Sequence, residues 1–128
     1  MGGVSVLDAM ANGDREALGA LVANRVVFNS PATAYEGREQ VVDVLAIGGE
    51  VLQGLTASRE PVQIGADETL TLIEANVDGE PLNGILLERR DEAGRIAELT
   101  ILLRPLGTLQ TAMRYIARAM AEGGVSGL

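Results

Sequence analysis

The sequence of 128 residues has no cysteine, histidine, tryptophan or lysine, and its ten basic residues are all arginine. These absences exclude a thiolate nucleophile, a Ser-His pair, a lysine Schiff base and a disulfide framework. They also exclude zinc sites built from His and Cys, which leaves carboxylates as the only ligands for a hard cation. Proton transfer would depend on Asp, Glu or the two tyrosines, Tyr35 and Tyr115. We expect no cofactor and no metal.

An excess of positive charge and long apolar runs are also missing. The formal net charge is −8, whereas surfaces that bind nucleic acid or anionic membranes need a basic face. No apolar run approaches the roughly 20 residues that cross a bilayer. The first residues, from Met1 to Asp8, lack the basic segment of a signal peptide. We therefore expect a cytoplasmic protein with neither a nucleic-acid nor a membrane partner.

Length and composition predict one domain. Apolar residues make up 47% of the chain, which is enough for one hydrophobic core. A length of 128 residues is too short for two ordinary domains. We predict a single domain over residues 1–121 and a flexible glycine-rich tail over 122–128.

Hydrophobic periodicity predicts helices in the first half and strands in the second. Helices are expected over 4–11, from an N-cap at Asp14 to about Val22, over 38–47 and after Pro105. The apolar stripe of the second helix is Ala17, Leu18, Leu21 and Val22. Gly48 and Gly49 are expected to weaken the third helix, and the segment between 30 and 37 is expected to be a loop. The predicted strands cover 25–29, 61–64, 70–77, 82–90 and 96–103.

The order of these elements predicts an α+β fold. The expected architecture is a curved, mainly antiparallel sheet wrapped around the N-terminal helices as a cone, plus a C-terminal helix. Such a sheet encloses either a filled core or a pocket at its open end. The aromatic content of 2% favours a pocket, although aliphatic side chains also pack densely.

Several short motifs are similar to those of a known family. In their order and spacing they resemble SnoaL-like proteins, which belong with ketosteroid isomerase, limonene epoxide hydrolase, polyketide cyclases and nuclear transport factor two in one superfamily. The resemblance covers about residues 5–120 and implies a cone-shaped fold, a deep pocket and commonly a homodimer, without implying one reaction. The motifs are NGD at 12–14, VVFNSP at 26–31, YEGR at 35–38, DEAGRIAELT at 91–100 and LRPL at 103–106.

The family's catalytic residues are not retained at the matching positions. The resemblance places the general-base Asp of ketosteroid isomerases at Ser30, their oxyanion-hole Asp at Leu86 and their oxyanion-hole Tyr at about Val6. Asn29 matches an Asn of limonene epoxide hydrolase, but the Asp-Arg-Asp set of that enzyme is absent from 73–75 and 99–101. We therefore transfer none of these activities.

Glu88 is the candidate catalytic residue. Side chains alternate between the two faces of a strand, so Glu88 points inward if Leu86 does. A carboxyl group in aliphatic surroundings has a raised pKa and is a candidate general acid or base. Alternatively, Glu88 lies near the end of its strand and is solvated, or is paired with Arg90 or Arg95.

The same alternation defines an expected ligand-binding surface. It sends Glu74, Asn76, Glu98, Thr100 and Arg104 outward. Asn29 and Ser30 either bind a ligand or only form the turn after the first strand. Tyr35 either offers its hydroxyl at the mouth or packs its ring on the third helix. The residues expected to face the ligand are Asn29, Ser30, Tyr35, Leu45, Ile73, Leu86, Leu99, Ile101 and Leu103.

The C-terminal helix has one apolar stripe at helical spacing. Met113, Ile116 and Met120 on this stripe are candidates for a lid over the pocket or for a dimer seam, with ordinary core packing favoured over both.

Three functional hypotheses follow. The leading one is a SnoaL-like protein that binds a small, mostly apolar molecule, steroid-, terpene- or polyketide-like, in an aliphatic pocket. The second is a cofactor-independent isomerase, cyclase or epoxide hydrolase that uses Glu88 as general acid or base. The third is a non-catalytic dimerisation module that pairs through the outward face of the last strands, at Thr100 and Leu102. A homodimer is expected in each case.

Overall fold

The computed structural model describes residues 5–123. Its helices, in chain order, are α1 (Val6–Ala11), α2 (Arg15–Leu21), α3 (Arg38–Val51) and α4 (Leu106–Glu122). Its strands are β1 (Val22–Asn29), β2 (Ala34–Glu36), β3 (Gln53–Ala57), β4 (Val62–Gln63), β5 (Glu68–Val77), β6 (Glu80–Arg90) and β7 (Ile96–Arg104).

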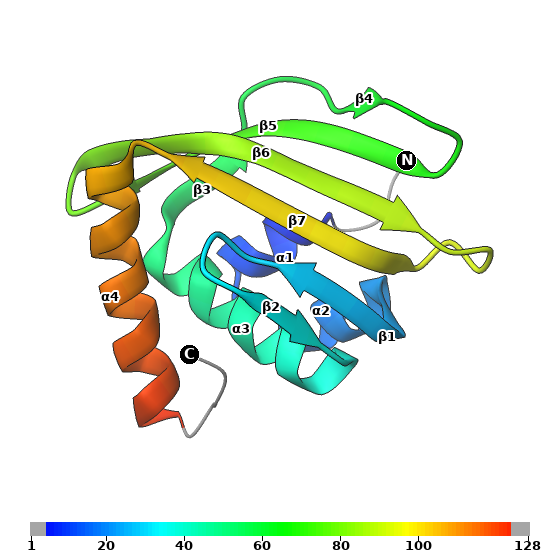
Figure 1. The fold of residues 1–128 in the computed structure, drawn as a ribbon, viewed down its shortest axis with the longest axis horizontal. Coiled ribbons are helices and arrows are strands. Elements are labelled where there is room, and N and C mark those ends of the chain that lie inside the picture. The colour runs from blue at the N-terminus through cyan, green and yellow to red at the C-terminus, as the bar shows by residue number, and fades with distance from the viewer. Residues whose placement is uncertain (1–4, 124–128) are drawn as a thin grey trace.

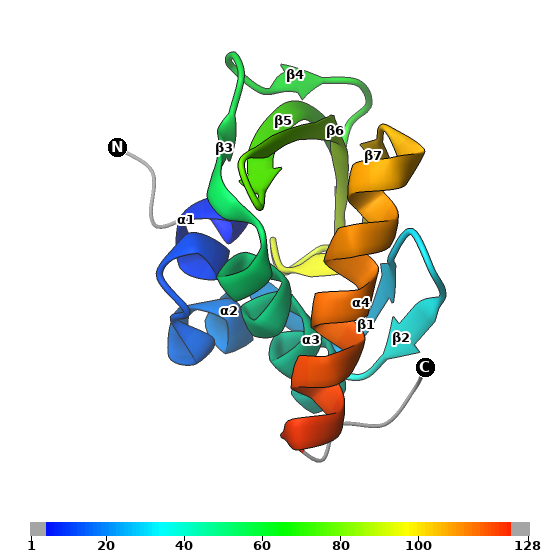
Figure 2. The same cartoon turned by 90° about the vertical axis from the view of Figure 1, so that its left-hand side faces the viewer.

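The strands form one curved sheet in the order β2-β1-β7-β6-β5-β3, with β4 paired to the outer part of β5. β1 runs parallel to β7, and every other pair is antiparallel. Helices α1, α2 and α3 lie against the concave face, and α4 crosses one end of the sheet (Figures 1 and 2). The α+β cone with a mainly antiparallel sheet and a C-terminal helix is therefore confirmed.

Three elements differ from the sequence prediction. Val22, expected on the stripe of the second helix, ends that helix and begins β1. The segment expected to be a loop contains β2, which pairs with β1 through Phe28 and Tyr35. Strand β3 was not predicted, because only Leu55 in its centre is buried and its sequence therefore shows no apolar alternation.

Helix α3 continues through Gly48 and Gly49 instead of ending before them. A Cβ atom on Gly49 would lie 1.9 Å from the backbone oxygen of Met10, whereas one on Gly48 would meet only the Met10 side chain, at 3.6 Å. The absence of a side chain at Gly49 thus lets the backbone of α1 approach α3. This close approach explains why a residue with poor helix propensity is present inside a helix.

The core lies between the helices and the concave face. Burial alternates along β5, β6 and β7, which confirms the predicted inward and outward sets. The inner set is almost entirely aliphatic, and Thr71 and Glu88 are its buried polar members. The tail was predicted to begin at residue 122, but Glu122 is the last residue of α4. Residues 124–128 of the predicted tail lie outside the described residues.

Candidate functional site

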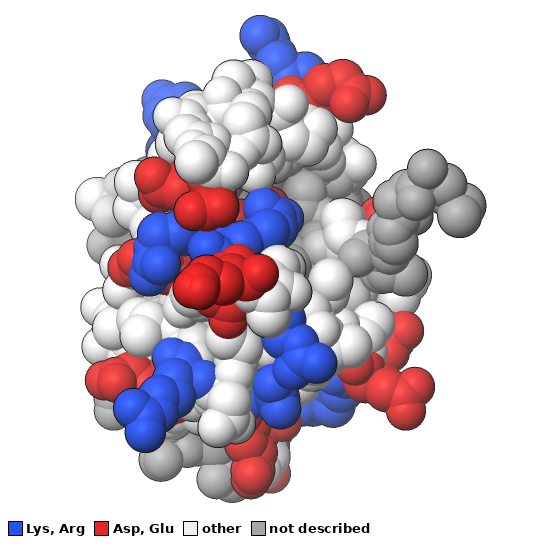
Figure 3. All heavy atoms as spheres, turned by 90° about the vertical axis from the view of Figure 1, so that its right-hand side faces the viewer, with Lys and Arg blue, Asp and Glu red and all other residues white. Residues whose placement is uncertain are grey.

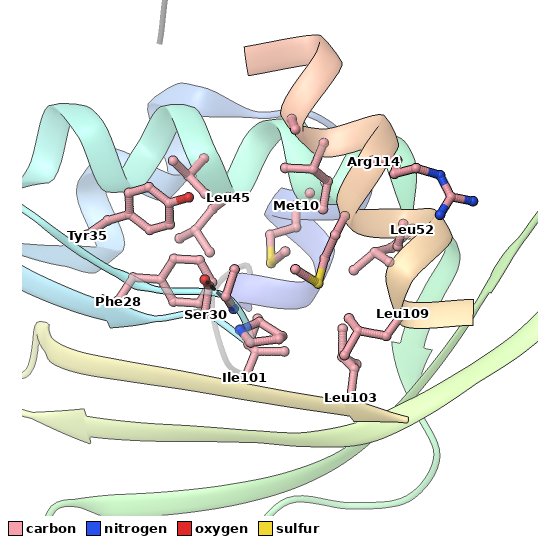
Figure 4. Close-up of a pocket in the computed structure, with 18 of the residues that line it drawn as sticks. Met10, Phe28, Ser30, Tyr35, Leu45, Leu52, Ile101, Leu103, Leu109 and Arg114 are labelled. Atoms are coloured by element: carbon pink, nitrogen blue, oxygen red, sulfur yellow. Dashed lines mark hydrogen bonds between the residues drawn. The ribbon is translucent and has the colours of Figure 1, made fainter. Parts of the chain in front are cut away.

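A cavity of about 570 Å³ lies between the concave face of the sheet and α4 (Figure 4). The sheet contributes Phe28, Ile101 and Leu103, and α1 contributes Met10. The remaining walls come from α3 and from one face of α4. The apolar residues on these walls are Val44, Leu45, Gly48, Leu52, Leu109, Ala112, Met113, Ile116 and Ala117.

Few polar groups reach this cavity. Ser30 lines it, but its hydroxyl oxygen donates to the carbonyl oxygen of Thr33 at 2.7 Å and accepts from two backbone N–H groups of the same turn. Arg114 lies at the rim, where its guanidinium donates to Thr111 and points away from the cavity in Figure 4. The Ser30 side chain therefore serves the turn, as one of the two sequence-based interpretations expected.

The Tyr35 hydroxyl is a polar group that faces the cavity. The residue is 3% exposed, and its ring stacks on Phe28 with centroids 6.1 Å apart. Within residues 5–123, the hydrogen-bond partner of its hydroxyl is the sulfur of Met120 at 4.0 Å. Burial raises the pKa of this phenol above its ordinary value, so the group remains a neutral donor at physiological pH.

The predicted ligand-binding residues divide into two groups. Ser30, Tyr35, Leu45, Ile101 and Leu103 line the cavity. Those packed in the core, away from its described lining, are Ile73, Leu86 and Leu99.

Asn29 lies on the other face of the sheet. Its side-chain amide donates to the Glu98 carboxylate at 3.0 Å and to the Thr100 hydroxyl at 3.1 Å. Both acceptors belong to the outward set, so the structure places Asn29 outside the cavity. Parallel pairing brings Asn29 beside Thr100 of β7, and a pairing between such distant segments leaves no trace in local sequence.

Glu88 is directed inward, as predicted, and is 8% exposed. Its neighbours on the adjacent strands are Thr69 of β5 and Leu99 of β7. Glu88 is not among the residues that line the cavity. Arg90 approaches its carboxylate at 3.4 Å and also donates to Thr69. Burial raises the Glu88 pKa, and the Arg90 charge partly opposes that effect.

The end of the molecule that holds Glu88 differs from the end that α4 covers. Figure 3 shows the end opposite α4, where acidic and basic side chains are interspersed over the surface. The residues that line the cavity belong to the part of the interior beneath α4, and Glu88 is not among them.

Sequence reasoning missed much of the cavity wall. Met10, Val44 and Leu52 line it, although their apolar character and helical spacing indicate only burial. Met113 and Ile116 also line it, which agrees with one of the roles considered for the apolar stripe of α4. Met120, at the far end of that stripe, instead packs in the core against Tyr35.

Neither a membrane span nor a metal cluster is found in the described part of the chain. None of the helices within residues 5–123 combines the length and apolar character needed to cross a bilayer. The same residues contain no group of three or more His, Cys, Asp or Glu side chains placed to hold a metal ion.

Comparison with known proteins identifies the fold. No protein-family model matches the chain, and no curated protein matches it. An uncharacterised protein with a cystatin-like fold from Silicibacter pomeroyi is 25% identical, with a TM-score of 0.84 over 92% of this chain and 84% of that one. A steroid delta-isomerase from Pseudomonas aeruginosa is also 25% identical, with a TM-score of 0.82 over 92% and 88% of the two chains.

A more distant neighbour has the same architecture. An NTF2-like protein of unknown function from Cytophaga hutchinsonii is 14% identical, with a TM-score of 0.63 over 84% of this chain and 97% of that one. Together these neighbours confirm the resemblance that the sequence motifs indicated.

Proposed function

Because the chain has the NTF2-like fold of the superfamily that contains SnoaL-like and ketosteroid isomerase-like proteins, we propose that it binds a small, mostly apolar molecule in the cavity beneath α4. The observation that carries this proposal is the cavity of about 570 Å³ with a predominantly apolar wall. Pockets of this size and character are typical of small-molecule sites. Steroid-, terpene- and polyketide-like skeletons have the matching chemistry.

Burial of ligand surface would supply the binding free energy. Apolar area removed from water contributes about 25 cal/mol per Å², before the costs of ordering the ligand are subtracted. The positions that match the catalytic acids of ketosteroid isomerases are Ser30 and Leu86 in this chain. Binding without the reaction of those enzymes is therefore the function that these residues support best.

A thermal-shift panel of steroids, terpenes and aromatic polyketides tests the proposal. A ligand that fits raises the unfolding temperature of the native protein, and above Kd the stabilisation grows with the logarithm of the ligand concentration. Ala112→Phe enlarges a buried α4 residue of the cavity wall and is expected to abolish the shift. Ala121→Phe, at an exposed position of the same helix, is the control and keeps it.

Two results would contradict ligand binding in the cavity. One is the absence of stabilisation by every member of the panel. The other is an Ala112→Phe variant that folds and binds as well as the native protein.

The second candidate is an enzyme in which Glu88 acts as general acid or base. Its support is a buried carboxyl group whose pKa is raised by burial. In this case Glu88 would have to reach a ligand past the core residues beside it, because it does not line the cavity. NMR titration of the Glu88 carboxyl group with and without a bound ligand tests the contact, and an unchanged pKa on binding would refute it.

A homodimer formed through the convex face of the sheet is proposed as the assembly. Leu102 is 52% exposed, and the register aligns it with Ile85 and Leu72 in one row across β7, β6 and β5. Apolar rows of this kind on a sheet surface are commonly covered by a partner. Sedimentation should show a dimer that Leu102→Asp dissociates, whereas Leu106→Asp, at an exposed leucine of α4, leaves it intact. A native protein that is monomeric at all concentrations would exclude this dimer.

A further inference from the structure

The Tyr35 hydroxyl is buried without a strong hydrogen-bond acceptor. The residue is 3% exposed, and the sulfur of Met120 at 4.0 Å is the contact the structure gives its hydroxyl. Thioether sulfur is a weak acceptor, and burying a hydroxyl without a good partner costs free energy. A better acceptor in the cavity would therefore be stabilised at this position.

The direction of the hydroxyl is set by its neighbours. The Tyr35 ring lies on Phe28, with which it pairs across β1 and β2, and the two planes differ by 24°. Both residues line the cavity, and Figure 4 shows the Tyr35 oxygen on the side of the ring that faces Leu45 and the interior. Because stacking already restricts the ring, a hydrogen bond to a ligand would cost little additional side-chain entropy.

The other polar residues of the described lining are engaged elsewhere or exposed. The Ser30 hydroxyl is used within its own turn. Gln110 and Arg114 are exposed at the rim, and the Arg114 guanidinium donates to Thr111. A carboxylate placed deep in this cavity would lose its hydration and gain one neutral donor, which is unfavourable.

We propose that Tyr35 selects the ligand, by donating a hydrogen bond to one uncharged acceptor oxygen on an otherwise hydrocarbon molecule. The ligand class is a neutral ketone or alcohol on a terpene-like or macrocyclic skeleton, with its oxygen held at the β1–β2 end of the cavity. This inference rests on the proposed function and adds to it the polarity and orientation of the ligand. Tyr35 is a separate position from Val6 in α1, where the family resemblance places the tyrosine of ketosteroid isomerases.

The test compares two pairs of probes that share a skeleton and differ by one ketone oxygen: camphor with bornane, and cyclododecanone with cyclododecane. The Kd of each is measured by displacement of the uncharged dye N-phenyl-1-naphthylamine from the native protein and from Tyr35→Phe. The substitution should weaken ketone binding relative to the matched hydrocarbon by about 3- to 10-fold, the effect of one neutral hydrogen bond. Because each probe is measured with both proteins, its own aqueous solubility cancels from the change in Kd, and the matched hydrocarbon reports any general effect of the substitution on the cavity.

Two further measurements separate a hydrogen bond from a general effect on folding. The carbonyl ¹³C resonance of bound ketone should move downfield in the native protein and return toward its apolar-solvent position in Tyr35→Phe. Tyr115→Phe is the matched control, because the Tyr115 hydroxyl donates to Asp78 at 2.6 Å on an exposed part of α4. It should leave both the Kd ratio and the resonance unchanged.

The possible outcomes distinguish this inference from the proposed function. If both members of a pair bind and Tyr35→Phe leaves their Kd ratio unchanged, the cavity binds apolar molecules but Tyr35 does not select them. If neither ketone nor hydrocarbon binds the native protein, the proposed function fails and the inference fails with it.

Discussion

The part of the interior next to α2 is filled by side chains, whereas the part beneath α4 encloses a cavity of about 570 Å³. In the filled part, Leu18, Val22, Val26 and Ile96 are fully buried. Both parts are lined by aliphatic residues, so composition does not separate them. The difference lies in how closely the covering helices approach the sheet and one another.

The contact between α1 and α3, beside the cavity wall formed by Met10 and Gly48, shows how closely two helices can approach. Gly49 allows the backbone of α1 to touch α3, and Met10 lies at this contact. Helix α4 instead contributes only Ala112 and Met120 as buried residues, and five of its apolar residues line the cavity. The apolar concave face of the sheet is thus part of the packed core where a helix lies close to it, and lines a pocket where the helix lies farther away.

The largest expected effect comes from truncating a leucine in the packed core. Leu86 is 1% exposed, and Leu86→Ala should destabilise the protein by about 2–5 kcal/mol, because a new void adds to the lost burial of the side chain. Leu103→Ala, on the same face of the sheet but at the cavity, should cost about 1–2 kcal/mol, since its removal only enlarges an existing space. Urea unfolding of both variants measures the difference, and equal losses would contradict the comparison.

The two adjacent glycines of α3 give the next effect, with opposite signs. Gly49→Ala places a Cβ atom against the backbone of Met10 and should destabilise the protein by about 3 kcal/mol through overpacking. Gly48→Ala makes only an ordinary contact and should stabilise the helix by up to about 1 kcal/mol. Chemical denaturation compares the two variants. A Gly49→Ala variant as stable as the native protein would show that α1 is free to move away from α3.

The smallest effect is a pH dependence that arises at Glu88. Burial raises the Glu88 pKa above 4.5, against the opposing charge of Arg90, so the folded protein holds this proton more tightly than the unfolded chain. The stabilisation from the protonated form is complete below 4.5 and is lost as the pH rises through the raised pKa of the folded state. Glu88→Gln should remove this loss.

Urea unfolding of the native protein and of Glu88→Gln, measured from pH 4.5 upward, tests the prediction. The stability of the variant relative to the native protein should increase with pH across that window. A difference that is constant, or that decreases with pH, would show that the Arg90 ion pair dominates the energetics of the Glu88 carboxyl group.

Much of the fold could be predicted because it depends on local pattern. The alternation along 70–77, 82–90 and 96–103 correctly assigned inward and outward faces, since successive side chains on a strand point to opposite sides. Asp14 was expected to cap a helix, and its side chain accepts a hydrogen bond from the Ala17 backbone N–H at 3.0 Å. The elements that were missed, β2 and β3, are short edge strands with little apolar alternation of their own.

The candidate site was less accessible to sequence reasoning. Ser30, Tyr35, Leu45, Ile101 and Leu103 were identified and do line the cavity. Asn29 was assigned to the site, but it follows the buried Phe28 in β1 and so points to the opposite face, where its partners Glu98 and Thr100 come from β7, about 70 residues away in the chain. The apolar stripe of α4 was recognised in the sequence, but the same spacing is equally typical of core packing, so it did not predict a cavity wall.

The sequence by itself determined which side chains point into the sheet's hollow, because that property follows from the two-residue period of each strand. It also determined that the hollow is aliphatic and contains few ionisable groups. Only the tertiary structure decided that part of the hollow stays open as a cavity. It also decided that Glu88 lies outside this cavity and that the Tyr35 hydroxyl faces into it. Those properties depend on distances between elements remote in the chain, which are set by close packing such as that of α1 on Gly49.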